Sequence, residues 1–194
     1  MEICVFYTSP KLGDIILQLP FVKAIAKHYN VNVTLCINKN INIGKILQKQ
    51  SYINSIIENP FRKGRFFLSD VFNLSKKLNE KNIDCAFILD KTKGPAIACN
   101  LARVKKIYGF GIGSQKYFVE KFPTLNRNDL RYNYTKQSIK FLYKINIFCD
   151  FNESFLVLDQ EENKNLLKEY EGLPKPWVCF AVDSTEVNRV WPQR

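Results

Sequence analysis

Short apolar runs alternate along this chain with segments whose apolar residues recur at helical spacing. The runs are rich in β-branched and aromatic residues and therefore predict strands, at 2–9, 31–38, 53–59, 83–90 and 105–110. Helices are predicted between and after them, at 14–29, 43–50, 71–78, 95–104, 131–145 and 161–170. Apolar strands that alternate with helices predict an α/β fold, a Rossmann-like, mainly parallel sheet with helices on both faces.

Residues near the helix ends refine these elements. Pro20 lies within the predicted helix 14–29 and should bend it or shift its start. Ser69 or Asp70 is placed to cap the helix that follows the third strand. Pro95 occupies a plausible first position of the next helix, because its missing N–H would be unpaired there anyway.

Composition describes an ordinary globular protein with an unusual charge. The chain has 194 residues, of which 46% are hydrophobic and 24% charged, enough for one large domain or one domain with a piece of a second. A net charge of +11 favours an anionic partner, namely nucleic acid, a membrane surface or a phosphorylated substrate. The alternative is compositional drift, since Lys, Asn and Ile are abundant together. Charge alone does not decide between them.

The cysteine pattern favours a reducing compartment. Six cysteines occur without any C-x-x-C pair; three lie inside the strands predicted above, and Cys179 lies inside a further predicted strand that follows Pro176. Buried free thiols in the cytoplasm are the better interpretation than a disulfide framework. No segment reaches the roughly 18 uninterrupted apolar residues of a membrane span, and we expect no signal peptide.

A carboxylate stands at the junction of the first predicted strand and the first helix, in the segment SPKLGD at 9–14. Parallel sheets bind ligands beyond the carboxyl ends of their strands, so Asp14 is a candidate general base for an acceptor hydroxyl. Gly13 would let a substrate approach the backbone closely. The alternative is a first-turn carboxylate that only caps its helix, worth about 0.3–1 kcal/mol. The local pattern leaves both interpretations open.

Basic residues also follow strand ends. Lys11 follows the first predicted strand, and Arg62, Lys63 and Arg65 lie in the segment PFRKGRFF after the third. Together they could hold a phosphorylated acceptor, because fixed cations bind phosphate oxygens. The alternative for each is a solvated surface charge.

Several common functional motifs are absent from the sequence. The cluster GFGIGS at 109–114 has Ser114 where a dinucleotide fingerprint needs its third glycine, and it follows the fifth strand rather than the first. No phosphate-binding loop of the G-x-x-x-x-G-K type and no D-x-D motif occur. His28 is the only histidine, which excludes His-based triads and most zinc sites. We therefore expect neither a cofactor nor a metal site.

The segment SPKLGDIILQLPFVKAI at 9–25 resembles the N-terminal signature of family 9 glycosyltransferases, the heptosyltransferases of lipopolysaccharide core synthesis. Three further segments are similar to that family in the same order. They are PFRKGRFF at 60–67, IDCAFILDKTKGPAIACNLARVKKIYGF at 83–110 and DSTEVNRVWP at 183–192. The resemblance spans most of 1–113 and again 177–192.

The resemblance implies a two-domain, metal-independent inverting enzyme of the GT-B fold. Residues 1–172 would form the acceptor-binding Rossmann-like domain, and 173–194 the linker and first strand of an incomplete, truncated donor-binding domain. Asp14 would then be the catalytic base. The acceptor would be held by residues of the first domain, namely Ser9, Lys11, Gly13, Arg62 and Lys63.

The donor implied by the resemblance is a nucleotide sugar such as ADP-heptose, bound as a substrate rather than a cofactor. Ser184, Thr185 and Arg189 would hold its diphosphate, with Arg189 where lysine is common in the family. The leaving diphosphate gains charge, which a fixed cation stabilises without a metal. We expect the chain to be inactive alone, because the family needs about as many residues again.

These expectations describe a monomeric cytoplasmic enzyme that works at the inner face of an anionic membrane on a phosphorylated glycolipid, with no nucleic acid. The rival hypothesis is a non-catalytic basic α/β module that binds nucleic acid or another polyanion. Its bases would stack on aromatic residues, namely Phe66, Phe67, Tyr108 and Phe110. The transferase hypothesis requires Lys11, Arg62 and Lys63 to converge on Asp14 across one cleft.

Overall fold

The structure is a computed structural model, and it describes residues 1–174 apart from 10, 39–43, 62–66, 152–155 and 158–159. The chain divides into two compact units, Met1–Val157 and Leu158–Arg194. The second unit contributes one described helix, α6 (Gln160–Glu169). Most of the expected second domain, at 173–194, lies outside the described residues, so the domain boundary stays a prediction.

The first unit is built on a five-stranded sheet in which every neighbouring pair of strands is parallel. The strand order is β3-β2-β1-β4-β5, which places the first strand at the centre. The predicted α/β fold is therefore confirmed. The strands are β1 (Ile3–Tyr7), β2 (Val33–Asn38), β3 (Ile53–Asn59), β4 (Cys85–Ile88) and β5 (Lys106–Gly109).

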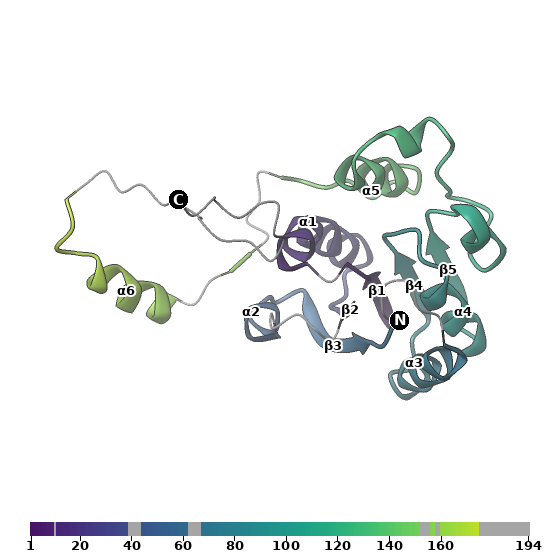
Figure 1. Cartoon of the computed structure of the whole chain (residues 1–194), viewed down its shortest axis with the longest axis horizontal. Coiled ribbons are helices and arrows are strands. Elements are labelled where there is room, and N and C mark those ends of the chain that lie inside the picture. Colours follow the sequence, from purple (N-terminus) through teal and green to yellow (C-terminus); the bar gives the residue numbers. More distant parts are fainter. Residues whose placement is uncertain (10, 39–43, 62–66, 152–155, 158–159, 175–194) are drawn as a thin grey trace, which may run out of the picture. The chain divides into compact units, whose positions relative to one another are not determined.

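Helices cover both faces of this sheet, as Figure 1 shows. Alternate residues of β1 separate the two cores, because successive side chains point to opposite faces. Ile3 and Val5 pack with residues of α1, α2 and α5, whereas Cys4 and Phe6 pack with residues of α3 and α4. The helices are α1 (Leu12–Tyr29), α2 (Gly44–Gln48), α3 (Leu68–Glu80), α4 (Gly94–Leu101) and α5 (Tyr134–Tyr143).

The helix starts differ from expectation in two places. α1 begins at Leu12 and continues through Pro20, so the proline does not shift the start. α3 begins after Phe67, whose extended backbone is the N-cap without any side-chain hydrogen bond, so the predicted cap by Ser69 or Asp70 is wrong. Both residues instead lie in the first turn. Asp14 and Asp70 are each the third residue of their helix.

Four of the cysteines lie buried in the sheet and α4 as free thiols, namely Cys4, Cys36, Cys85 and Cys99. Burial raises the pKa of each thiol, that of Cys85 to about 12. The prediction of buried free thiols is confirmed for these four. Cys149 is half-buried, and Cys179 lies outside the described residues.

The glycine cluster at 109–114 is a turn that ends β5. Gly111 and Gly113 have positive φ angles of 70° and 59°. A Cβ atom at Gly111 would lie 2.5 Å from Cγ2 of Thr124, so glycine is required there on two grounds. The turn leads into a short 3-10 helix, η1 (Gly113–Tyr117).

Candidate active site

The site lies where the order of strands reverses. β1 pairs with β2 on one side and with β4 on the other, and the helices that follow β1 and β4 pack on opposite faces of the sheet. In open parallel sheets this switch point leaves a crevice at the carboxyl ends of the two strands.

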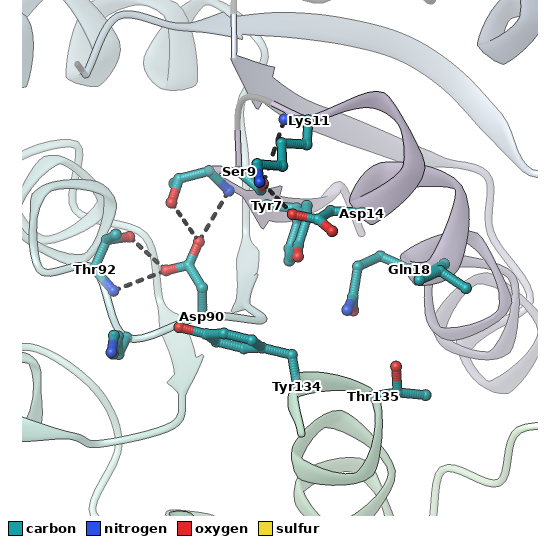
Figure 2. A pocket seen from close by; sticks show the side chains of 12 residues that line it. Tyr7, Ser9, Lys11, Asp14, Gln18, Asp90, Thr92, Tyr134 and Thr135 are labelled. Atoms are coloured by element: carbon teal, nitrogen blue, oxygen red, sulfur yellow. Dashed lines mark hydrogen bonds between the residues drawn. The ribbon is translucent and has the colours of Figure 1, made fainter. Parts of the chain in front are cut away.

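A cavity of about 420 Å³ occupies this crevice. Its walls are the segments that follow β1 and β4, the first turns of α1, and the first turn of α5. The lining residues are Tyr7, Thr8, Ser9, Lys11, Asp14, Leu17, Gln18, Asp90, Lys91, Thr92, Tyr134 and Thr135 (Figure 2). Six of these twelve residues carry a hydroxyl group, and two lysines and two carboxylates accompany them.

Asp14 reaches the cavity from the first turn of α1 and is half-buried. The Ser9 hydroxyl donates a hydrogen bond of 2.6 Å to Oδ2 of Asp14. The backbone N–H of Lys11 donates in turn to Oγ of Ser9, at 3.4 Å. No described residue hydrogen-bonds to Oδ1 of Asp14. The carboxylate is therefore oriented by one oxygen, while the other can accept a proton.

Tyr7 lies at the end of β1 with only 6% of its surface exposed. Burial raises the pKa of its phenol well above the usual value, and the carboxylates of Asp14 and Asp90 raise it further, against a hydrogen bond with Gln18 that lowers it. The phenol therefore stays protonated at physiological pH and can donate a hydrogen bond.

Two further parts of the wall were not predicted from the sequence. Asp90 follows β4 and hydrogen-bonds to Thr8 and Thr92, which join the ends of β1 and β4. Tyr134 and Thr135 come from the first turn of α5 and line the same cavity as Asp90 (Figure 2). The position of Asp90 at a strand end was a usable signal. The two α5 residues gave none, because their place depends on the path of the chain between β5 and α5.

The structure brings together three of the predicted site residues, Ser9, Lys11 and Asp14, on one cavity. Gly13 is exposed in the first turn of α1 outside that wall, and a Cβ atom there would meet nothing within 4 Å. The other predicted residues lie outside the described part of the chain, so their convergence on the site stays a prediction. These are Arg62, Lys63, Arg65, Ser184, Thr185 and Arg189.

The base-stacking surface of the rival hypothesis is not formed by Phe110. This side chain is fully buried and packs against Phe141, with ring centroids 5.3 Å apart. Tyr108 is half-buried and packs on Phe87 at 5.1 Å. Phe67 is exposed, and Phe66 lies outside the described residues. Two of the four aromatic residues therefore belong to the core.

Within the described residues there is neither a cluster of possible metal ligands nor a helix suited to span a membrane. No three His, Cys, Asp or Glu side chains gather there as possible metal ligands. Among the helices of that same part of the chain, none combines the length and apolar character that crossing a bilayer requires.

Comparison with known proteins gives a structural likeness without a sequence match. No protein-family model matches the chain, and no curated protein does. A solved glycosyl transferase of family 9 from Veillonella parvula DSM 2008 is similar in structure, with a TM-score of 0.72 and 18% identity. The match covers 98% of this chain and 56% of that one.

The chain has the fold of a family 9 glycosyltransferase. Two E. coli structures agree: heptosyltransferase WaaC with ADP-2-deoxy-2-fluoro heptose (TM-score 0.65, 14% identity) and ADP-heptose lps heptosyltransferase II (0.62, 15%). The matches cover 99% and 88% of this chain, but only 62% and 50% of those proteins. The resemblance to family 9 is thus confirmed at the level of the fold, over little more than half of the neighbours' length.

Proposed function

We propose that this chain takes part in glycosyl transfer, as the half of a metal-independent inverting glycosyltransferase that binds the acceptor. One observation carries the proposal: Asp14, held through one oxygen, faces a hydroxyl-rich cavity of about 420 Å³ at the switch point of the sheet. The structural likeness to family 9 supports the reaction class.

In the proposed reaction Asp14 acts as general base. Its carboxylate takes the proton of an acceptor hydroxyl while the hydroxyl oxygen attacks the anomeric carbon of the donor sugar. The bond from that carbon to the diphosphate breaks, and the nucleoside diphosphate leaves with the electron pair. The configuration at the anomeric carbon inverts because attack and departure occur on opposite faces.

The cavity wall favours a sugar acceptor that carries phosphate. The hydroxyl groups of Ser9, Thr92 and Thr135 suit hydrogen bonds to a polyol, and the lysines at 11 and 91 supply positive charge for an anionic group. We propose a phosphorylated glycolipid of the lipopolysaccharide-core type as the acceptor. Arg62 and Lys63 would add to this charge.

For the donor we propose a nucleotide sugar, with ADP-heptose as the first candidate because two of the similar structures carry that name or an analogue of it. Ser184, Thr185 and Arg189 are the proposed diphosphate ligands. The enzyme would act as a monomer in the cytoplasm, at the inner face of an anionic membrane, since the net charge of +11 favours such a surface.

The test is the variant Asp14→Asn in the complete gene product, assayed by mass spectrometry for sugar transfer from ADP-heptose to a lipopolysaccharide-core acceptor. We expect turnover to fall by about 10²–10⁴-fold, as for loss of a general base, with the affinity for the donor nearly unchanged. Asp70→Asn is the matched control, because Asp70 occupies the same position in α3.

The control separates catalysis from helix stabilisation. Both variants remove a first-turn carboxylate, so both weaken a helix by a similar small amount. Only Asp14→Asn should remove turnover. Near-normal transfer by Asp14→Asn, or an equal loss in Asp70→Asn, would exclude Asp14 as the base.

A further inference from the structure

Asp90 is a buried carboxylate on the cavity wall to which the proposed reaction gives no step. Only 6% of its surface is exposed. Oδ2 accepts hydrogen bonds from the backbone N–H of Thr8 at 2.9 Å and from its hydroxyl at 2.7 Å. Oδ1 accepts from the N–H of Thr92 at 2.8 Å and from its hydroxyl. Both oxygens are engaged by fixed donors, so Asp90 is poorly suited to be a second base.

These bonds lie one residue away from the contact that orients Asp14. Thr8 is followed directly by Ser9, whose hydroxyl donates to Asp14 at 2.6 Å. The regular ladder between β1 and β4 ends before this point, at the pair Phe6 and Ile88, with one more bond from Leu89 to Phe6. The side chain of Asp90 therefore fixes Thr8 where the sheet no longer does.

The loop that carries Asp90 is itself held from behind by Gln115, which is fully buried. Its Nε2 donates to the carbonyl of Asp90 at 2.9 Å and to that of Thr92 at 2.8 Å, and its Oε1 accepts from the N–H of Gly111. The segment after β4 is thus anchored to the turn after β5. Through its hydrogen bonds to Thr8, Asp90 connects this anchored segment to the end of β1.

The same two strands carry a matching carboxylate at their other end. Asp84 precedes β4, and its Oδ2 accepts from the backbone N–H of Glu2 at 3.0 Å, while Oδ1 accepts from Lys105 at 2.6 Å. Glu2 and Asp84 are separated by 82 residues, as are Thr8 and Asp90. Asp84 does not line the cavity. A comparison of Asp84 with Asp90 therefore separates the effect of holding the two strands together from an effect on the site.

We propose that Asp90 is a positioning residue for the base: by fixing Thr8 it sets the position of Ser9 and, through the Ser9 hydroxyl, the orientation of the Asp14 carboxylate. This inference rests on the proposed function. It extends the functional part of the site from the α1 junction to the end of β4, and it gives the Asp90 side chain a role that burial alone would not require.

The test compares Asp90→Asn with Asp84→Asn in the complete gene product. Asparagine keeps the size of the side chain but replaces one acceptor oxygen by an NH₂ group, which repels two of the four donors. We expect kcat to fall by roughly 3- to 10-fold in Asp90→Asn, because its effect reaches Asp14 through the Ser9 hydroxyl and cannot exceed the value of that one hydrogen bond. The KM for the acceptor should change less than about threefold, and Asp84→Asn should retain its kcat.

A second variant keeps the test informative if Asp90→Asn does not fold. Thr8→Val removes one hydroxyl donor and leaves the carboxylate, so it should show a smaller loss of kcat with the same small change in KM. The proposal would be overturned if Asp90→Asn and Asp84→Asn lost kcat in the same proportion to their loss of thermal stability. It would also be overturned if both Asp90→Asn and Thr8→Val had a normal kcat.

A structural readout separates this proposal from the proposed function. If the unmodified protein shows no sugar transfer, the proposed function fails, and crystal structures of Asp90→Asn and Thr8→Val decide the positioning role. A contact between Ser9 Oγ and Asp14 Oδ2 that lengthens beyond hydrogen-bonding distance in either variant supports it. A contact that stays at its present length in both excludes it.

Discussion

At the scale of single residues, the site depends on how one carboxylate is held. Asp14 takes a short hydrogen bond from Ser9 on one oxygen, and the buried phenol of Tyr7 lies in the same wall with its pKa raised by burial. A base needs a defined orientation as well as a charge, and Ser9 supplies it. The Tyr7 phenol is neutral, so it can donate a hydrogen bond in the site without taking up the proton that Asp14 is proposed to accept.

This arrangement predicts the effect of Ser9→Ala. Loss of the hydroxyl removes the 2.6 Å bond to Asp14 and frees the carboxylate to rotate, so turnover should fall by roughly 3- to 10-fold, the value of one net hydrogen bond. Steady-state kinetics of the complete gene product measure it, with the exposed Ser69→Ala as control. A loss as large as that in Asp14→Asn would contradict a purely orienting role.

Sequence reasoning found the residues that lie within one strand-to-helix junction and missed those brought in by the fold. Ser9, Lys11 and Asp14 share a short segment at a strand end, where a general rule places ligand sites. Tyr134 and Thr135 reach the same cavity from α5, and no local pattern marks them. Their position follows from packing of α5 beside α1.

At the scale of elements, α5 is held in place by two lysines that pair with the buried carboxylate of Asp129. Asp129 accepts from the N–H of Asn126 at 3.0 Å, from Lys140 at 3.1 Å and from Lys144 at 3.2 Å. Burial disfavours the charge of Asp129, but these three donors outweigh burial and lower its pKa to about 2. Both lysines belong to α5 or its C-cap, so these contacts fix the helix whose first turn forms the cavity wall.

The lowered pKa predicts a pH dependence of stability. The folded protein keeps Asp129 charged down to about pH 2, whereas the unfolded chain takes up the proton near the usual value of 3.8. The contribution is therefore complete above about pH 4 and is lost as the pH falls towards 2. We expect Asp129→Asn to lower the free energy of unfolding at pH 7 by about 1–2 kcal/mol.

Urea unfolding between pH 2 and pH 7 measures this effect. The difference between the unmodified chain and Asp129→Asn should shrink as the pH approaches 2, whereas the exposed Glu80→Gln should show little difference throughout. A difference that stays constant over this range would show that the charge of Asp129 is not what stabilises α5.

Element types were predictable because each apolar run is short and bounded by polar residues. The predicted strand 53–59 coincides with β3, and the helix predicted at 14–29 differs from α1 only at its start. The start of α3 was mispredicted because the cap position is occupied by Phe67, whose extended backbone ends the preceding segment without a side-chain hydrogen bond. The preference for Ser, Thr, Asp or Asn at the N-cap is statistical, and the path of the backbone can place another residue there.

At the scale of the whole first unit, the order of strands decides where the site is. The alternation of elements predicted a parallel sheet, but not that β1 lies between β2 and β4. That order depends on which face each connecting helix covers, since crossover connections are right-handed on either side. Once it is known, the switch point selects the ends of β1 and β4 among all the strand ends.

Because the cavity exists only when β1, β4 and α5 are assembled, its ligand should stabilise the fold. A lipopolysaccharide-core oligosaccharide with its phosphates should increase the free energy of unfolding of the 194-residue chain, by about 2.7 kcal/mol at a ligand concentration of 100 Kd. Its melting temperature should rise accordingly. Differential scanning calorimetry measures the shift, with the dephosphorylated oligosaccharide as control. An equal shift for both sugars would contradict the assignment of the lysines at 11 and 91 to phosphate.

The central place of β1 also has a consequence for synthesis of the protein. β1 leaves the ribosome before the other strands of this sheet, yet its partner β4 lies about 80 residues later, as the separation of 82 between Thr8 and Asp90 shows. Until β4 emerges, one edge of a fully apolar strand has no partner, and such edges promote aggregation. Nascent chains of this protein therefore pass through a stage in which residues 3–7 are exposed, and chaperone binding to them at that stage would reduce aggregation most.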